Sequence, residues 1–209
     1  MKIGLYFGSF NPVHHGHLMI ASHVVNRTEV QQVWFVVSPE NPFKTAGSLL
    51  NEYDRLHLVN LAIENDEARL RASDVEFKLP RPSYTIDTLI YLEEKYPQHQ
   101  FSIIMGSDGF VNIPRWKNAD ILLKKYAFYV YLRPGFETID TLGADVTILK
   151  APLLNISATD IRENIKEYLE LNGFDVFESE NGKTGLSLAH SNTPDVIISD
   201  VMMPEMNGI

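Results

Sequence analysis

Apolar residues occur along this chain as short continuous runs that alternate with segments of helical periodicity. Uninterrupted apolar runs are typical of strands buried on both faces of a parallel sheet. They predict strands at 3–7, 33–38, 70–77, 101–105, 127–132 and 146–149. Helical spacing lies between them, near 17–25, 51–63, 85–96 and 117–125. The alternation of strand and helix predicts an α/β fold with a doubly wound parallel sheet.

The helix predicted from about Asn51 has an inward stripe of apolar residues. On the 3.6-residue period the stripe comprises Tyr53, Leu56, Val59, Ala62 and Ile63. Arg55 lies off this stripe, and the pattern alone is nearly as consistent with a plain surface arginine as with a functional one.

The first predicted strand is followed at once by a glycine-rich turn and a helix. Gly8, Pro12 and Gly16 interrupt regular structure, so the helix is expected to begin near Gly16. Such a turn directs backbone N–H groups and the positive end of the helix at one point, where phosphate binds well. His14 and His17 can donate to phosphate oxygens when suitably protonated. The alternative is that they are ordinary surface histidines.

A second candidate phosphate site lies far along the chain, over residues 155–162. Ser157 with Asp160 three residues later approximates a capping box, with Asp in place of the usual Glu or Gln. The helix end, the hydroxyls of Ser157 and Thr159, and the Arg162 guanidinium could converge on a triphosphate.

Composition excludes several classes of protein. The 209 residues carry a formal charge of −9, which disfavours sequence-independent binding of nucleic acid. The absence of cysteine excludes disulfides and thiolate metal sites. No apolar run approaches the roughly 20 residues of a membrane span, so no membrane partner is expected and a cytoplasmic location is predicted. The sequence does not decide between a monomer and a homo-oligomer.

The stretch GSFNPVHHGH resembles the G-x-F-[DN]-P-x-H-x-G-H signature of the HxGH nucleotidyltransferases, and so implies a Rossmann-like sheet of the nucleotidyltransferase type. The resemblance implies catalytic roles for His14, His17, Lys44 and Arg162, and a site-ordering role for Arg55. It further implies that ATP is bound by Gly8, Ser9, Phe10, Gly16, Gly106, Asp108, Ser157 and Thr159. Mg²⁺ is expected to arrive with ATP, without metal ligands from protein side chains.

The stretch PSYTIDTL at 82–89 is similar to a run in nicotinate-mononucleotide adenylyltransferases, one family within that superfamily. From the residues alone, Ser83 or Thr85 is expected to cap a helix, and Trp116 could equally be core filler. The resemblance implies instead that Tyr84, Thr85, Trp116 and Arg133 bind the nicotinate nucleotide. A separate stretch, Gly182-Lys183-Thr184, looks like the end of a P-loop. Phe177 stands where the first glycine of that motif belongs, so a P-loop is not predicted.

From Ile165 onward the chain changes character, with two Lys against eight Asp and Glu, or 2 − 8 = −6. This tail resembles part of a response-regulator receiver, with Asp200 at the phospho-acceptor position on a strand. The fragment lacks the receiver's first strand and acidic pair and everything after residue 209, so Asp200 is expected to be inactive. The expected division is an adenylyltransferase domain at 1–162 and a truncated, incomplete flavodoxin-like βα segment at 163–209.

The sequence therefore predicts an enzyme that transfers the adenylyl group of ATP to nicotinate mononucleotide. Two alternatives remain within the same reading: another member of the superfamily, such as a pantetheine-phosphate adenylyltransferase, or a catalytically dead chimera. The sequence does not distinguish nicotinate from nicotinamide as the preferred acceptor.

Overall fold

The computed structural model describes residues 1–39, 50–136, 140–149, 166, 169–170, 173–179, 182–197, 202–203 and 206–207. The chain divides into two compact units, Met1–Lys44 with Asn51–Leu154, and Thr45–Leu50 with Asn155–Ile209. The first unit holds the sheet and nearly all predicted site residues. Five predicted residues lie outside the described residues: Lys44, Ser157, Thr159, Arg162 and Asp200.

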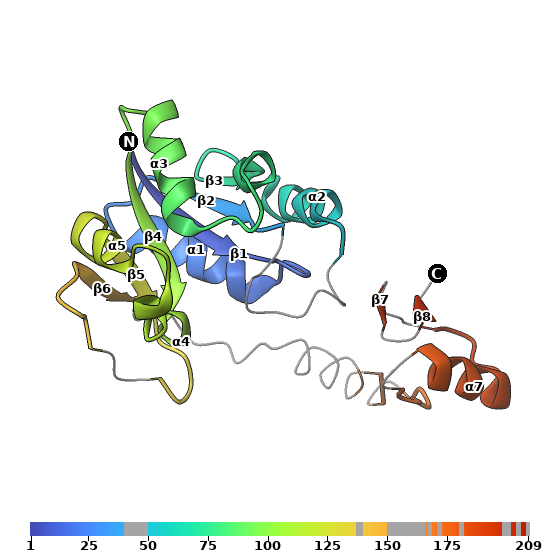
Figure 1. Cartoon of the computed structure of the whole chain (residues 1–209). Coiled ribbons are helices and arrows are strands. Elements are labelled where there is room, and N and C mark those ends of the chain that lie inside the picture. The colour runs from blue at the N-terminus through green and yellow to red at the C-terminus, as the bar shows by residue number, and fades with distance from the viewer. Residues whose placement is uncertain are drawn as a thin grey trace. The chain divides into compact units, whose positions relative to one another are not determined.

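The first unit is built on a six-stranded sheet in which all neighbouring strands are parallel (Figure 1). Its order is β3-β2-β1-β4-β5-β6. Strands β1 to β3 therefore extend the sheet in one direction and strands β4 to β6 extend it in the other, so the strand order reverses between β1 and β4. The strands are β1 Lys2–Gly8, β2 Gln32–Val37, β3 Leu70–Ser73, β4 Gln100–Gly106, β5 Phe128–Tyr131 and β6 Val146–Leu149. The predicted doubly wound α/β sheet is confirmed.

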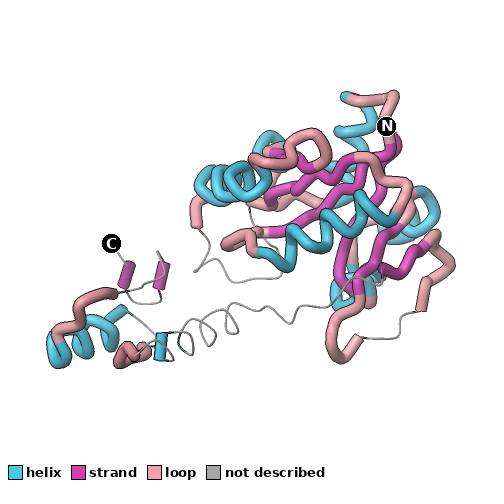
Figure 2. The backbone as a smooth tube through the Cα atoms, turned by 180° about the vertical axis from the view of Figure 1, so that it is seen from behind, coloured by secondary structure: helices cyan, strands magenta, loops and turns pink. Residues whose placement is uncertain are grey.

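Two apolar cores, one on each face of the sheet, explain why the strand sequences are continuously apolar. Along β2, Trp34 and Val36 belong to one core, whereas Val33, Phe35 and Val37 belong to the other. Helices α3 Thr85–Lys95 and α5 Ala119–Lys125 contribute to the first core. Helices α1 His15–Arg27 and α2 Glu52–Ile63 contribute to the second, and helices are visible on both faces in Figures 1 and 2. Apolar burial on both faces is the main favourable contribution to this fold.

Two boundaries differ from the sequence expectation. The strand predicted over 70–77 ends at Ser73, and a 3-10 helix, η1 Val75–Lys78, follows it. The helix predicted from residue 117 begins at Ala119, after Asn118 in the left-handed region with φ 53°. Short elements α4 Ser107–Phe110 and η2 Ile113–Arg115 lie between β4 and α5.

The described part of the second unit contains α7 Gly182–Asn192 and a two-stranded antiparallel pair, β7 Met202–Met203 with β8 Met206–Asn207. The strand expected to carry Asp200 is not formed by its described residues, since Val196 and Ile197 lie outside any strand and are exposed. Among the described residues, no helix is long and apolar enough to span a membrane.

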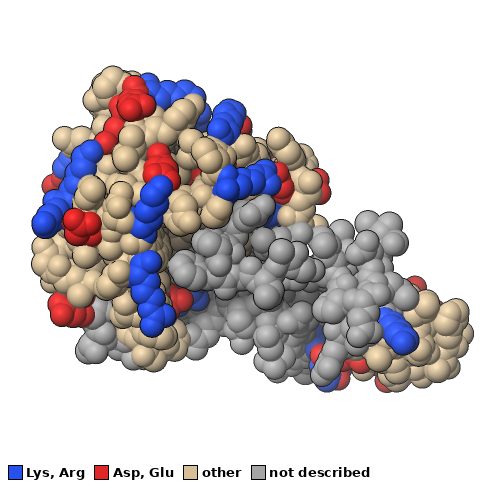
Figure 3. Space-filling model, viewed as in Figure 1, with Lys and Arg blue, Asp and Glu red and all other residues tan. Residues whose placement is uncertain are grey.

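Charged side chains on the face of the first unit shown in Figure 3 are interspersed, with acidic and basic groups adjacent. Among the described residues of this unit, several basic side chains pair with carboxylates, including Arg81 with Glu52 and Lys117 with Asp87. This face therefore does not present the concentrated basic surface that polyanion binding requires.

Candidate active site

The carboxyl ends of β1, β4 and β5 are neighbours, because these three strands are adjacent in the sheet. In open α/β sheets, ligands bind at this edge, where the strand order reverses. The β1 end leads to the His14–His17 turn, the β4 end to Asp108, and the β5 end to Arg133. Residues about 120 positions apart in sequence are thereby placed around one region.

His14 and His17 form a stacked pair at the start of α1. Their ring centroids are 3.7 Å apart, with 29° between the ring planes. The backbone N–H of His14, the residue preceding the helix, donates to His17 Nδ1 at 3.2 Å. With Nδ1 as acceptor, a neutral His17 carries its proton on Nε2, which is then a hydrogen-bond donor. His14 Nδ1 is buried and has no hydrogen-bond partner among the described residues.

Both imidazoles are held in the neutral form. Burial, together with the nearby charges of His14 and Arg133, lowers the pKa of His17 to about 3. The pKa of His14 is also lowered, first by burial and then by the charges of Arg133 and His15. The pair therefore offers neutral N–H donors at pH 7, which refines the sequence expectation that protonation would be needed for donation.

The depressed pKa of His17 predicts acid sensitivity of the first unit. On unfolding, His17 regains its ordinary pKa of 6.5, so the unfolded chain binds the extra proton. Its contribution to stability is present above pH 6.5 and is lost as the pH falls toward 3. At pH 5 the loss should be about 2 kcal/mol.

Denaturant unfolding at pH 7 and pH 5 measures this loss. Tryptophan fluorescence is a suitable signal because Trp34 and Trp116, the only tryptophans of the chain, both lie in the first unit. A His17→Gln variant should lose about 2 kcal/mol less than the wild type between the two pH values. Equal losses would show that His17 is not buried in its neutral form.

Aromatic rings seat the histidine pair on the sheet. The His17 ring contacts Phe10 and Tyr6 at centroid distances of 5.1 and 5.9 Å. Phe10 has φ 45° and is buried against Tyr6 and Phe35, so its ring is core and any ATP contact from this residue must come from its backbone. A Cβ at Gly16 would lie 3.1 Å from the His14 ring. Glycine at this position thus lets His14 lie over the start of the helix.

Asp108 and Arg133 face each other across the ends of β4 and β5. Arg133 Nε lies 3.8 Å from Asp108 Oδ1, and both side chains are about half exposed (46% and 50%). A Cβ at Gly106 would come within 2.3 Å of the Asp108 carboxylate and 3.3 Å of the Arg133 side chain. Glycine at 106 is therefore needed for both side chains to lie close to the strand end. The buried Ser107 hydroxyl accepts from the Arg133 backbone N–H at 2.8 Å.

Arg55 is fully buried (0% exposed) rather than on the surface, and Tyr53, expected to face inward, is 65% exposed. The Arg55 side chain donates hydrogen bonds to backbone carbonyls. Nη1 donates to the carbonyls of Ser9 and Ser38, and Nη2 donates to that of Pro39. The guanidinium thus joins the segments that follow β1 and β2. The buried stripe of α2 is Arg55, Val59 and Ile63, and Ala62 is exposed. This i, i+4, i+8 spacing was present in the sequence, but the charge of Arg55 concealed it.

The start of α3 is not capped as the sequence predicted. The residue preceding the helix is Tyr84, and within the described residues its side chain makes no capping hydrogen bond. Ser83 lies one residue before the N-cap position, and its hydroxyl donates to Glu76 Oε2 at 3.0 Å. Thr85 is the first residue of the helix. The Asp87 N–H of this first turn bonds to the Tyr84 carbonyl, so the N–H groups of Thr85 and Ile86 are the ones available to bind an anion.

Trp116 is half-buried against the first core. The next residue, Lys117, donates to both carboxylate oxygens of Asp87 at 3.0 and 2.8 Å. The Lys117 ammonium also lies 4.9 Å from the centre of the Tyr84 ring, and Tyr84 is 39% exposed. Lys117, which sequence reasoning missed, thus connects the Trp116 segment to the first turn of α3.

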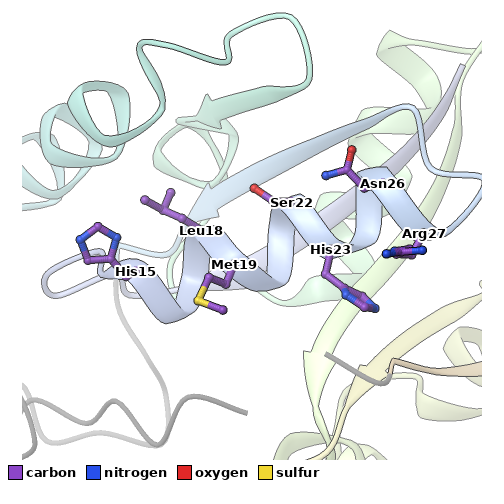
Figure 4. A pocket seen from close by; sticks show the side chains of 7 residues that line it. All are labelled: His15, Leu18, Met19, Ser22, His23, Asn26 and Arg27. Atoms are coloured by element: carbon purple, nitrogen blue, oxygen red, sulfur yellow. The ribbon is translucent and has the colours of Figure 1, made fainter. Parts of the chain in front are cut away.

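No group of three or more His, Asp or Glu side chains that could hold a metal ion occurs in the part of the chain that the structure describes. A groove of about 530 Å³ lies along α1 and is separate from the histidine pair (Figure 4). All its lining comes from that one helix: His15, Leu18, Met19, Ser22, His23, Asn26 and Arg27. Its surroundings lack the convergent polar groups from several elements that the strand ends provide, so the strand ends are the candidate site.

Two family models match the chain. Residues 5–164 match the cytidylyltransferase-like family, and residues 158–209 match the response regulator receiver domain. The two matches overlap by seven residues, from 158 to 164.

Relatives and solved structures resemble the first unit. A protein of Flavobacterium psychrophilum named "Probable nicotinate-nucleotide adenylyltransferase" is 51% identical over 169 residues, covering 79% of this chain and 87% of its own length. One of the same name from Cytophaga hutchinsonii is 50% identical over 168 residues, covering 80% and 87%. The nicotinic acid mononucleotide adenylyltransferase of Plasmodium falciparum, solved with NaAD, has a TM-score of 0.64 at 23% identity, covering 78% and 82%. At that identity the likeness concerns the fold.

Proposed function

The chain belongs to the cytidylyltransferase-like family, and we propose that it transfers the adenylyl group of ATP to nicotinate mononucleotide. The products are nicotinate adenine dinucleotide and pyrophosphate, a step of NAD biosynthesis. The observation that carries the proposal is the pairing of two features at one edge of the sheet. One is the buried, neutral histidine pair after β1, and the other is the uncapped start of α3, within the PSYTIDTL run.

On the donor side, His14 and His17 contact the phosphates of ATP. A neutral imidazole with Nδ1 engaged presents Nε2–H to an oxygen, and such a fixed donor stabilises charge that grows in the transition state. Gly8, Ser9, Phe10 and Gly16 form the surrounding turn. Lys44, Ser157, Thr159 and Arg162 lie outside the described residues and are proposed, on the resemblance, to complete the phosphate site.

Gly106 and Asp108 bind the nucleoside part of ATP in this proposal. The Asp108 carboxylate, half exposed at the end of β4, accepts hydrogen bonds from ribose hydroxyls. On the acceptor side, the first turn of α3 with Tyr84 and Thr85 binds the pyridine carboxylate, and Trp116 stacks on the ring. Arg133, which faces Asp108 across the ends of β4 and β5, contacts the nicotinate nucleotide in this proposal.

The reaction needs no covalent intermediate on the protein. A phosphate oxygen of the acceptor attacks the α-phosphorus of ATP, the new P–O bond forms, and the bond to pyrophosphate breaks in line. Positioning and neutralisation of charge account for catalysis of this kind. Mg²⁺ would arrive bound to ATP and would neutralise part of the charge of its phosphates.

We further propose that the enzyme domain comprises residues 1–162 and that residues 163–209 are a receiver-like segment. The two family matches, 5–164 and 158–209, support this division. Asp200 is outside the described residues and is proposed to be inactive, because the segment lacks the acidic pair that receiver chemistry requires.

An acceptor panel tests the function. The whole chain is incubated with ATP, Mg²⁺ and one acceptor at a time: nicotinate mononucleotide, nicotinamide mononucleotide or phosphopantetheine. Pyrophosphate release and the mass of the dinucleotide product are measured. Product with nicotinate mononucleotide is expected. Product with phosphopantetheine alone would assign the chain to the other adenylyltransferase, and no product with any acceptor would support the dead-chimera alternative.

A further inference from the structure

Glu76 is a buried carboxylate to which the proposed mechanism gives no task. It lies in η1, between β3 and α3, and is 3% exposed. Burying a carboxylate is costly unless its oxygens are hydrogen-bonded. Oε2 accepts from the Ser83 hydroxyl at 3.0 Å, and Oε1 accepts from the Thr88 hydroxyl at 2.9 Å. The Ser38 side chain is a third hydrogen-bonding partner.

These three partners come from two different elements. Ser83 and Thr88 bracket the first turn of α3, whereas Ser38 follows the end of β2. The Ser38 carbonyl accepts from Arg55, and Arg55 also binds the carbonyl of Ser9 beside the histidine turn. A continuous series of polar contacts, with Arg55, Glu76 and Thr88 buried, therefore runs from the phosphate turn to the start of α3.

We propose that Glu76 is a positioning residue that holds the first turn of α3 in place for the carboxylate of the acceptor. This inference rests on the proposed function. The carboxylate engages the hydroxyls of Ser83 and Thr88, the groups on either side of Tyr84 and Thr85. By accepting from Ser83 the carboxylate fixes the residue that precedes Tyr84, while the N–H groups of Thr85 and Ile86, which no side chain caps, are available to the substrate.

Pairing with Ser38 adds a second consequence. The same carboxylate fixes the start of α3 relative to the end of β2, and through Arg55 relative to Ser9. The ATP site and the nicotinate mononucleotide site are thereby held at a fixed distance from each other along the sheet edge. Misplacement of one substrate by about 1 Å is enough to slow a reaction that depends on positioning.

Hydrogen–deuterium exchange of the unliganded chain tests the positioning without using activity. In the wild type, the N–H groups of Asp87 and Thr88 are protected by the Tyr84 carbonyl, at 2.9 and 3.1 Å. Glu76→Ala should speed exchange in the peptide containing them by about tenfold or more. Glu76→Gln, which keeps an acceptor oxygen and the side-chain length, should stay within about threefold of the wild type.

The matched control is Glu93→Ala. Glu93 is an acidic residue of the same helix that accepts from Lys125, far from the first turn. Its replacement should leave exchange at Asp87 and Thr88 within about twofold of the wild type. Ser83→Ala is the second variant, in case Glu76→Ala does not fold. It should raise exchange in the same peptide by about threefold.

Steady-state kinetics measures the consequence for the acceptor. Glu76→Ala should raise the KM for nicotinate mononucleotide by about tenfold and change that for ATP by less than about twofold. The inference is overturned if Glu76→Ala leaves both the exchange of the Asp87–Thr88 peptide and the acceptor KM within about twofold of the wild type. A wild-type chain without activity would refute the proposed function, and the exchange measurement would still decide whether Glu76 positions α3.

Discussion

The His17→Ala variant is expected to turn over at least about a hundredfold more slowly than the wild type, at saturating ATP and acceptor. His17 is held by the His14 N–H on one side of its ring and by Phe10 and Tyr6 around it. Its remaining N–H is therefore fixed before substrate arrives. A fixed donor costs little reorganisation as charge develops, and for this reason its loss should reduce kcat more than it raises KM.

The measurement is pyrophosphate release by the whole chain, with His23→Ala as the matched control. His23 is a histidine of the same helix that lines the groove along α1 instead of the strand-end site (Figure 4). The control variant should keep a rate within about twofold of the wild type. Circular dichroism must show that both variants are folded. A folded His17→Ala enzyme with a near-normal rate would remove this residue from the mechanism.

Arg55→Ala is expected to lower the free energy of unfolding of the first unit by about 3–5 kcal/mol. Removal of the guanidinium leaves the carbonyls of Ser9, Ser38 and Pro39 without this donor, and it leaves a cavity where a fully buried side chain stood. Activity should fall with stability, because Ser9 belongs to the proposed phosphate turn. Arg55→Lys should be intermediate, since an ammonium cannot reproduce the planar fork of donors.

Denaturant unfolding followed by tryptophan fluorescence measures the loss, because both tryptophans lie in the first unit. Arg69→Ala is the matched control. Arg69 pairs with Asp66 on the surface, at 2.7 Å with nearly half its side chain exposed, and such exposed pairs contribute little to stability. If Arg55→Ala lowered the free energy of unfolding no more than Arg69→Ala, the three carbonyls would have to find other donors. The site-ordering role of Arg55 would then be wrong.

The order and type of the sheet elements could be read from the sequence because they follow from local pattern. A strand covered on both faces must be apolar at every position, and the runs in β1, β2 and β4 have this character. The glycines and histidines of the first turn likewise adjoin one another in sequence. The family and the position of the histidine pair were predictable for these reasons.

Three features of the site were not predictable in this way. Arg55 was assigned to no inward stripe, the segment containing Glu76 was expected to be strand, and Ser83 was expected to cap α3. Each depends on contacts between separate segments of the fold: Arg55 bonds to Ser9, 46 residues away, and Glu76 of η1 bonds to Ser83 and to Thr88 of α3. Burial of a charged group is favourable only when those partners are in place.

The sequence by itself determined the six-stranded architecture and the chemistry available at the first turn, because periodicity and adjacent residues encode both. Only the tertiary structure decided the protonation state of His17, the burial of Arg55 and the engagement of Ser83 by Glu76. Those properties arise from desolvation and from hydrogen bonds between separate elements. Both depend on the environment that the folded chain creates around a side chain, and residue identity alone does not specify that environment.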